Sequence, residues 1–142
     1  MTEVYHHGIK GQRWGVRRYQ NQDGTLNAAG IKRLWKMENR KQKYQKLLDR
    51  NRSELSSREK SLLEASENYR QAKGRAKVKA GWNKIVAKER YFGFGERAME
   101  ENMVAERIIL SIVAKQEKML MSDARSKDFS NAKDFLEKFY RE

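Results

Sequence analysis

The densest group of chemically informative side chains is a run of cations near the middle of the chain. Across residues 73–88, Lys and Arg recur at short intervals and no carboxylate interrupts them. Such a run predicts a phosphate-facing surface, because each cation that contacts a phosphate releases bound counterions. The candidate nucleic-acid-binding residues are Lys73, Arg75, Lys77, Lys79, Lys84 and Lys88. The alternative is that the basic surface only keeps a helical protein soluble.

Residues suited to catalysis or metal binding are few. The two histidines, His6 and His7, are adjacent, and the chain has no Cys that could complete a zinc site. Glu100, Glu101 and Glu106 lie next to arginines at helix-surface spacing, which is typical of solvated ion pairs rather than of an acid–base dyad. No Gly-Lys-Ser/Thr phosphate loop occurs. We therefore expect no catalytic residues, no cofactor and no metal.

The first 27 residues have a different composition from the rest of the chain. Gly8, Gly11 and Gly15 follow one another closely and are interleaved with aromatic side chains. Glycine suits a backbone that needs positive φ or close approach, and aromatic residues are unusual in flexible linkers. We predict an irregular docking or cap module over residues 1–27. Within it, residues 13–20 are expected to form a short strand, residues 21–24 its Asp23-Gly24 turn, and Asn27 the N-cap of the next helix. The candidate residues of the module are His6, His7, Gly8, Gly11, Arg13, Trp14, Gly15, Arg17, Arg18 and Tyr19.

A longer motif runs through this module. Residues 6–21 read HHGIKGQRWGVRRYQN, and they are followed by DGTL at 23–26 and by Ala29-Gly30. This motif resembles a short N-terminal module of head and structural proteins from tailed phages and prophages of Gram-positive bacteria. The resemblance covers about the first 34 residues, and Asn27-Ala28 stands where the module often has Thr-Pro. It implies a phage context and leaves the activity open.

Composition indicates long amphipathic helices rather than a large globular core. The chain has 142 residues, 32 Lys and Arg against 19 Asp and Glu, a formal net charge of +13 and a mean hydropathy of -1.02. A thin apolar face suits such numbers, and assembly with a partner or with itself would enlarge the core. No signal peptide precedes residue 28, and the longest apolar run is too short to span a membrane. We expect no membrane association, and a location in the virion or in the host cytoplasm during infection.

The remainder, residues 28–142, predicts an all-α fold, a helical hairpin or bundle capped by the irregular module. There is no Pro, and Leu48, Leu55 and Leu62 belong to a seven-residue repeat. The complementary positions include Asn51 and Arg58, and Ser56 with Glu59 matches a capping box, so we predict a break near residues 51–56. The expected helices span about 28–53, 57–90, 96–123 and 130–141. One unbroken helix from 28 to about 90 is the alternative.

Two aromatic stretches further along the chain carry separate expectations. Tyr91-Phe-Gly-Phe-Gly95 predicts a tight turn. Trp82 is expected to pack against another helix, and stacking on a nucleic-acid base is the alternative. The segment from Glu96 to Asp123 has apolar residues on more than one face, which is typical of a central or partner-binding helix. Near the end, Ser130 is the expected N-cap of an aromatic-faced helix. That helix either closes the bundle or forms a partner interface through Phe135, Leu136, Phe139 and Tyr140.

These features support three hypotheses about function. The leading one is a non-enzymatic virion or head-associated structural protein that docks through its N-terminal module and holds basic helices near nucleic acid. The second is a phage-encoded, host-directed inhibitor of the anti-CRISPR type that binds a nucleic acid or a nucleoprotein. The third is a coiled-coil scaffolding or assembly factor. The expected partners are phage structural proteins or further copies of the chain, so we expect an oligomer or a larger assembly.

Overall fold

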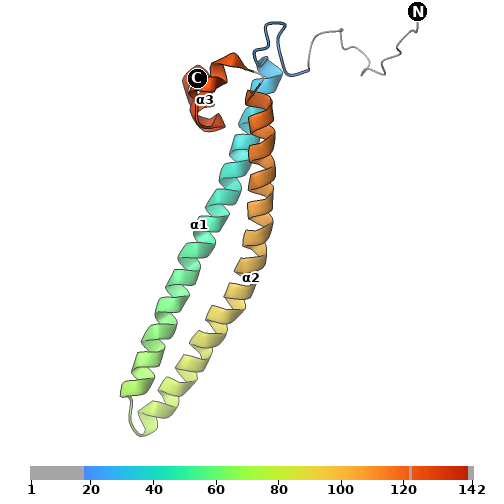
Figure 1. The fold of residues 1–142 in the computed structure, drawn as a ribbon. Coiled ribbons are helices and arrows are strands. Elements are labelled where there is room, and N and C mark those ends of the chain that lie inside the picture. Colours follow the sequence, from blue (N-terminus) through green and yellow to red (C-terminus); the bar gives the residue numbers. More distant parts are fainter. Residues whose placement is uncertain (1–17, 122, 141–142) are drawn as a thin grey trace, which may run out of the picture. The chain divides into compact units, whose positions relative to one another are not determined.

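Helices make up most of the chain that the structure describes. The computed structural model describes residues 18–121 and 123–140. Helix α1 spans Ala28–Gln71, α2 spans Arg75–Leu120, a 3-10 turn spans Ala124–Asp128 and α3 spans Ala132–Phe139. The long helices α1 and α2 pack against each other as a hairpin (Figure 1). The predicted all-α, helical-hairpin class is therefore confirmed.

The chain divides into two compact units, which are described separately. The terminal unit contains both ends of the chain, residues 1–41 and 111–142. The hairpin unit contains residues 42–110. Each long helix begins in one unit and continues into the other.

The predicted break near residues 51–56 is wrong, because α1 continues without interruption through the hairpin unit. Two series of positions on α1 repeat every seven residues, one through Leu48, Leu55 and Leu62 and the other through Asn51 and Arg58. Both face the inner seam, the surface along which α1 meets α2. Every position of the two series from Tyr44 to Tyr69 is half-buried or buried. Asn51, the polar residue that suggested a break, is only 4% exposed. Its side-chain amide donates to Asn102 Oδ1 at 2.9 Å and to Glu101 Oε2 at 3.2 Å. A buried Asn paired in this way fixes the register of two helices at a cost in stability.

Arg58, the second polar residue of the seam, is also paired across it. Its guanidinium lies 4.6 Å from the centre of the Phe94 ring and donates to the Arg90 carbonyl oxygen at 3.1 Å. Its Nε also donates to Glu54 Oε1 at 2.9 Å, one turn earlier on α1. Ser56 is exposed in the middle of α1 and caps no helix. The contacts of Asn51 and Arg58 with α2 therefore keep α1 continuous in spite of the capping-box pattern.

The expected turn at residues 91–95 is also wrong. Tyr91–Gly95 lies inside α2, which runs without a break from Arg75 to Leu120. The first part of the predicted helix 57–90 belongs to α1 instead, which ends at Gln71. Phe94 faces α1 through Arg58, and Gly95 faces Leu55 of α1. These inner contacts hold the glycine-containing turn in helical form. Tertiary packing outweighs the weak helix propensity of Gly, which costs about 1 kcal/mol relative to Ala.

In the terminal unit, a tight turn leads into α1. The predicted turn at Asp23-Gly24 and the predicted N-cap at Asn27 are both confirmed. Gly24 has φ of 83°, and Asp23 Oδ1 accepts from the Thr25 backbone N–H at 2.9 Å. Asn27 caps α1, because its Oδ1 accepts from Gly30 N–H at 2.9 Å. Residues 13–17 of the expected strand over 13–20 lie outside the described residues. In the described part, Gln20 forms an antiparallel bridge with Leu26.

The core of the terminal unit joins the start of α1 to the end of the chain. Its six buried residues are Leu26, Ile31, Leu34, Ala132, Phe135 and Leu136. Helix α3 is capped by Asn131, whose side chain accepts from Asp134 N–H at 3.0 Å, and not by Ser130 as predicted. Ser130 instead donates to the Asp134 carboxylate from the preceding position.

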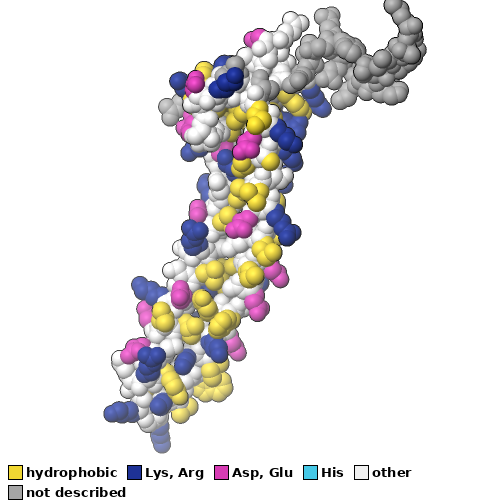
Figure 2. All heavy atoms as spheres, in the orientation of Figure 1, with side chains coloured by type: hydrophobic (Ala, Val, Ile, Leu, Met, Phe, Trp, Pro, Cys, Tyr) yellow, Lys and Arg dark blue, Asp and Glu magenta, His cyan; other side chains and the backbone are white. Residues whose placement is uncertain are grey.

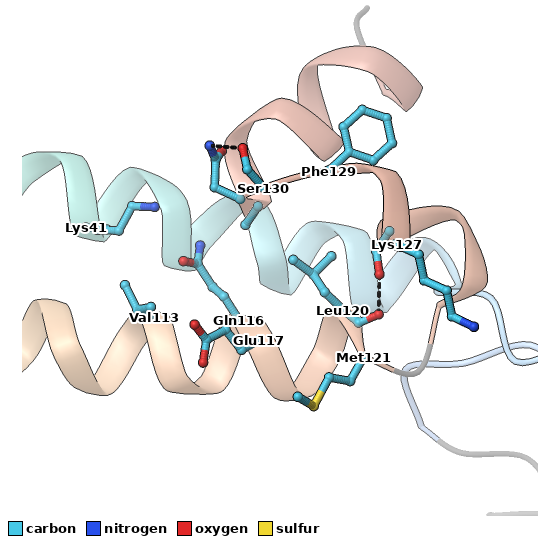
Figure 3. A pocket seen from close by; sticks show the side chains of 12 residues that line it. Lys41, Val113, Gln116, Glu117, Leu120, Met121, Lys127, Phe129 and Ser130 are labelled. Atoms are coloured by element: carbon cyan, nitrogen blue, oxygen red, sulfur yellow. Dashed lines mark hydrogen bonds between the residues drawn. The ribbon is translucent and has the colours of Figure 1, made fainter.

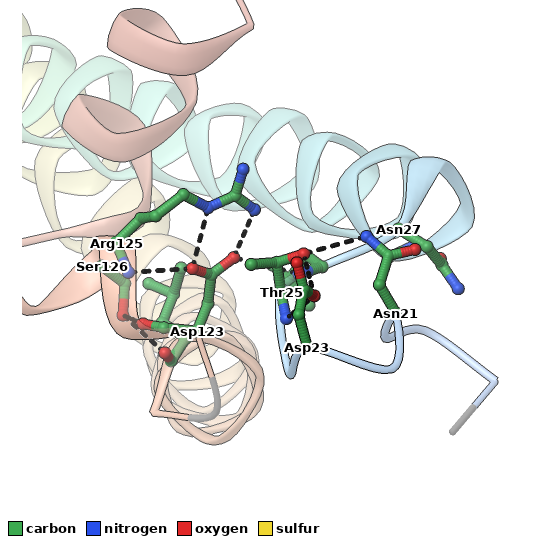
Figure 4. A network of polar contacts seen from close by, with 10 residues as sticks. Asn21, Asp23, Thr25, Asn27, Asp123, Arg125 and Ser126 are labelled. Carbon is green, nitrogen blue, oxygen red and sulfur yellow. Dashed lines mark hydrogen bonds and ion pairs between the residues drawn. The ribbon is translucent and has the colours of Figure 1, made fainter. Parts of the chain in front are cut away.

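A buried carboxylate connects the turn before α1 to the segment after α2 (Figure 4). Asp123 is fully buried and accepts from Leu26 N–H at 3.0 Å. It also accepts from Arg125 through the backbone N–H and two guanidinium nitrogens, at 2.9, 3.0 and 2.6 Å. Burial raises the pKa of Asp123, but these hydrogen bonds and the positive charge of Arg125 outweigh burial and leave the pKa below its usual value.

Candidate nucleic-acid interface

The hairpin turn brings the basic residues of two helices together at one end of the hairpin unit. Helix α1 ends at Gln71, α2 begins at Arg75, and Gly74 between them has φ of 57°. A side chain is strained in this left-handed conformation, which Gly adopts freely just after a helix. The sequence predicted helix through this position, so the turn at Gly74 is a correction. The sequence signal that could have indicated this turn is Gly74 itself, which follows a run of strong helix formers.

Seven cations and no carboxylate occupy residues 68–88, on both sides of this turn. All six predicted residues are among them, and only Lys84 is half-buried while the others are exposed. Arg70, near the end of α1, is the seventh member, which the prediction did not include. Its guanidinium lies 3.5 Å from the Glu67 carboxylate in a largely exposed pair. We call residues 68–88 the basic end.

Tyr69 organises two of these cations. Lys77 Nζ lies 5.2 Å and Lys84 Nζ 5.1 Å from the centre of the Tyr69 ring. Gly81 lies against the same ring, because a Cβ there would be 3.4 Å from the Tyr69 ring, which is van der Waals contact. Cation–π contacts of this kind contribute about 0.5–1 kcal/mol at exposed sites. Tyr69 therefore holds two ammonium groups in place while their charges remain available to an anion.

The aromatic side chain next to the cations is exposed, contrary to the packing that the sequence predicted. Trp82 is 65% exposed, as is Val78 one turn before it. They line a shallow groove of about 290 Å³ with Tyr69, Lys77, Gly81 and Ile85. A groove with cations on its rim and an aromatic wall can accept a phosphate backbone, and a flat ring can also pack on a base or an apolar side chain.

Of the predicted docking residues, only two are described. Arg18 and Tyr19 lie within the described chain, and those between His6 and Arg17 lie outside it. The Arg33 guanidinium covers the Tyr19 ring at 4.6 Å, and the Tyr19 carbonyl accepts from Asn27 N–H at 3.1 Å. A side chain at Gly30 would collide with that carbonyl oxygen. Tyr19 therefore attaches the end of the module to the first turn of α1.

The predicted partner interface at the end of the chain is wrong for two of its four residues. Phe135 and Leu136 are fully buried in the core of the terminal unit. Phe139 is 41% exposed and Tyr140 is half-buried, and the Phe135 and Phe139 ring centres lie 5.4 Å apart. This aromatic cluster closes the unit, which is the alternative that the sequence left open. The hydrophobic effect decides it, because large apolar side chains become buried wherever the chain supplies a matching surface.

The terminal unit also contains a pocket of about 540 Å³ (Figure 3). Val113, Leu120 and Phe129 form apolar walls, and Lys41 lies at its edge. Lys41 Nζ is paired with the buried Glu38 carboxylate at 2.7 Å, and Gln116 donates to the same carboxylate at 3.0 Å. Among residues 18–121 and 123–140, no group of three or more His, Asp or Glu side chains is placed to hold a metal ion. No helix in the same part of the chain is long and apolar enough to cross a membrane.

Comparison with known proteins provides no assignment. No family model, curated protein or solved structure matches this chain. The chemistry of the basic end and the motif of the N-terminal module are therefore the features that bear on function.

Proposed function

We propose that this protein is a non-enzymatic structural component of a tailed-phage particle, attached through its N-terminal module, with its basic end placed against nucleic acid. The single observation that carries the nucleic-acid contact is the basic end itself, seven cations without a carboxylate on both sides of the turn between α1 and α2. The phage context is supported by the motif at residues 6–30.

Phosphate chemistry explains why this surface suits a nucleic acid better than an acidic protein of defined shape. The cations of the basic end lie on two helices and a turn, and most are exposed. Lys is a point charge on a flexible stem, which contacts phosphates without demanding one geometry. Such contacts bind independently of base sequence and weaken as salt rises. A structural protein that holds packaged nucleic acid needs this kind of binding.

The nucleic-acid part of the proposal is tested by replacing Lys73, Arg75, Lys77 and Lys79 together with Ala. In a plot of log K against log salt concentration, the magnitude of the slope should decrease by about three to four, because each lost phosphate contact removes nearly one unit. A matched control replaces Lys43, Lys46, Arg50 and Arg52, which are exposed on α1 of the same unit and change the net charge equally. An equal loss in both variants would show that net charge alone drives binding and would contradict a defined site.

The structural role is tested by mass spectrometry of purified particles, quantified against the major capsid protein. A fixed copy number per particle is the expected result. Trp14→Ala should remove the protein from particles while its helical circular dichroism is unchanged, if residues 6–19 dock it. Absence from particles, with abundant protein in infected cells, would instead favour the host-directed inhibitor or the scaffolding factor.

A further inference from the structure

An apolar stripe runs along α2 on a face that the hairpin does not use. Starting at Val78, positions spaced alternately by four and three residues run to Leu110. Seven of these ten positions carry large apolar side chains, and the remaining three carry Glu. The seven are Val78, Trp82, Ile85, Phe92, Met99, Met103 and Leu110, which we call the outer stripe. Each is between 46% and 69% exposed, and Figure 2 shows hydrophobic side chains recurring along the hairpin.

The outer stripe is not the face that packs against α1. That inner face of α2 includes Ala98 and Ala105, which are 1% and 0% exposed, together with Phe94. A seven-residue repeat with two apolar positions is the pattern of a helix that packs along another helix. Helix α2 carries that pattern twice, on two faces, and α1 covers one of them. An exposed apolar stripe of this length marks an interaction surface.

We propose that the outer stripe binds the outer stripe of a second copy of this chain, with the two α2 helices antiparallel. A partner must be a helix of the same length with the same spacing, and a second copy supplies both. In a two-fold pair the same surface serves on both sides. Val78 then lies opposite Leu110 of the other copy, and the two-fold axis passes between Phe92 and Glu96. Four long helices would bury the stripe in a bundle.

Charge complementarity selects the antiparallel orientation. Residues 75–90 contain six cations and one carboxylate, whereas residues 91–110 contain four carboxylates and two cations. An antiparallel pair places each basic half beside an acidic half of the other copy, and a parallel pair would place like charges together. Flanking charges set partner choice and orientation in helical pairs, because like charges placed side by side repel.

Gly93 is an independent observation in favour of a partner helix. It lies in the middle of the stripe region and is exposed, and a Cβ there would meet no described atom within 4 Å. Glycine destabilises a helix interior relative to alanine, so its presence needs a reason. By contrast, Gly81 and Gly95 face residues of α1, because a Cβ there would lie 3.4 Å from the Tyr69 ring and 3.8 Å from Leu55. Gly93 lies beside the proposed two-fold axis, where two helices approach each other most closely.

The size of the surface is adequate for a stable dimer. With exposures of 46–69%, the seven side chains offer on the order of 800 Å² per copy, about what each partner contributes to an interface of standard size. The three Glu positions reduce the affinity of the pair. We therefore expect a dimer that forms at micromolar concentration and dissociates on dilution.

The first test measures mass against concentration by sedimentation equilibrium, with the full chain and no nucleic acid. Phe92→Glu should weaken dimerisation at least about a hundred-fold, because it removes an apolar ring from the contact and places a second carboxylate beside Glu96 of the other copy, where like charges repel. Leu63→Glu is the matched control, since Leu63 is 64% exposed on α1 of the same unit and lies outside the stripe. A monomer at every concentration, or an equal effect of both variants, would overturn the proposal.

The second test determines the relative orientation of the two α2 helices by disulfide cross-linking. The sequence contains no Cys, so only an introduced Cys can react. Oxidation of a mixture of Val78→Cys and Leu110→Cys chains should give the mixed disulfide dimer, and Val78→Cys alone should give little. Efficient cross-linking of Val78→Cys with itself would show a parallel pair and overturn the proposed geometry. The outer stripe and the basic end share Val78, Trp82 and Ile85, which also line the groove beside Tyr69. The two proposals are separated by their readouts, because Phe92 variants change the mass and variants of the basic-end cations change salt-dependent binding.

Gly93→Ala provides a third test, in which monomer stability and dimer affinity should change in opposite directions. We expect it to raise the thermal unfolding midpoint of the dilute monomer, because Ala is the better helix former and finds open space. The same change should weaken the dimer several-fold, because the added methyl group separates the two helices. A dimer strengthened in parallel with the monomer would show that no helix approaches Gly93.

Discussion

The terminal unit and the hairpin unit use the same kinds of side chain in opposite ways. In the terminal unit, Phe135 and Leu34 are fully buried. In the hairpin unit, Phe92 and Trp82 are 53% and 65% exposed, and the buried seam contains Asn51 and small residues. The first unit has the organisation of a core that is complete within one chain. The second has the organisation of a helix pair that presents a further apolar face.

This difference shows that apolar content alone does not reveal where a core lies. Helix α2 is rich in apolar residues throughout, yet many of them are exposed along the hairpin unit. Two helices can bury only the faces that meet, so a third apolar face needs another element. In the terminal unit α3 is such an element, because it places Phe135 and Leu136 against residues from α1.

The largest expected effect compares the same substitution in the two units. Phe135→Ala should destabilise the protein by about 3–5 kcal/mol, because it leaves a cavity in a closed core. Phe92→Ala should cost less than about 0.5 kcal/mol in dilute protein, because that ring is largely in water. Urea unfolding followed by circular dichroism measures both. Similar losses in the two variants would mean that the hairpin unit also has a closed core.

The second prediction tests the buried carboxylate of the terminal unit. Asp123→Asn should cost about 2–3 kcal/mol at neutral pH, because it weakens charge-assisted hydrogen bonds to Arg125 and to Leu26 N–H. The folded-state pKa of Asp123 is lowered, so its contribution is fully present above the usual Asp pKa and is lost as pH falls through the folded pKa. The stability gap between wild type and variant should therefore shrink in acid.

Urea titrations at neutral and acidic pH measure that gap. Asp49→Asn is the control, because Asp49 is exposed on α1 of the hairpin unit and has no such network. It should leave stability nearly unchanged at both pH values. A gap for Asp123→Asn that stays constant with pH would mean that its charge contributes nothing to the fold.

The smallest expected effect concerns the polar seam of the hairpin unit. Asn51→Ala should cost about 1–2 kcal/mol, because it leaves Glu101 and Asn102 without the amide that pairs them. Asn68→Ala, on the exposed face of α1, is the control and should be near neutral. Chemical denaturation resolves the difference. If Asn51→Ala stabilised the protein, the seam would be held by apolar packing alone.

Much of the local structure could be predicted from the sequence. Asn27 caps α1 and Asp23-Gly24 forms its turn, because both are decided by hydrogen bonds within a few residues. The heptad positions of α1 also lie on the inner seam as their spacing indicates. Six of the seven cations of the basic end were predicted, because a run of like charges can be recognised without the tertiary structure.

Tertiary structure decided what those local rules could not. Asn51 and Arg58 appeared to end a helix, yet both are satisfied by residues more than thirty positions away. Phe135 and Leu136 were compatible with either an interface or a core, and contact with Leu34 and Ile31 made them a core. Gly74 became the turn, whereas Gly95 remained helical because Leu55 lies against it.

The sequence by itself determined that this chain is helical, basic at one place and able to cap its first long helix, because short-range hydrogen bonds and charge density decide these properties. Only the tertiary structure decided which apolar faces meet. Helix α2 has two apolar faces and α1 can cover one, so packing geometry selected Ala98 and Ala105 for the seam and left Trp82, Phe92 and Met99 in water.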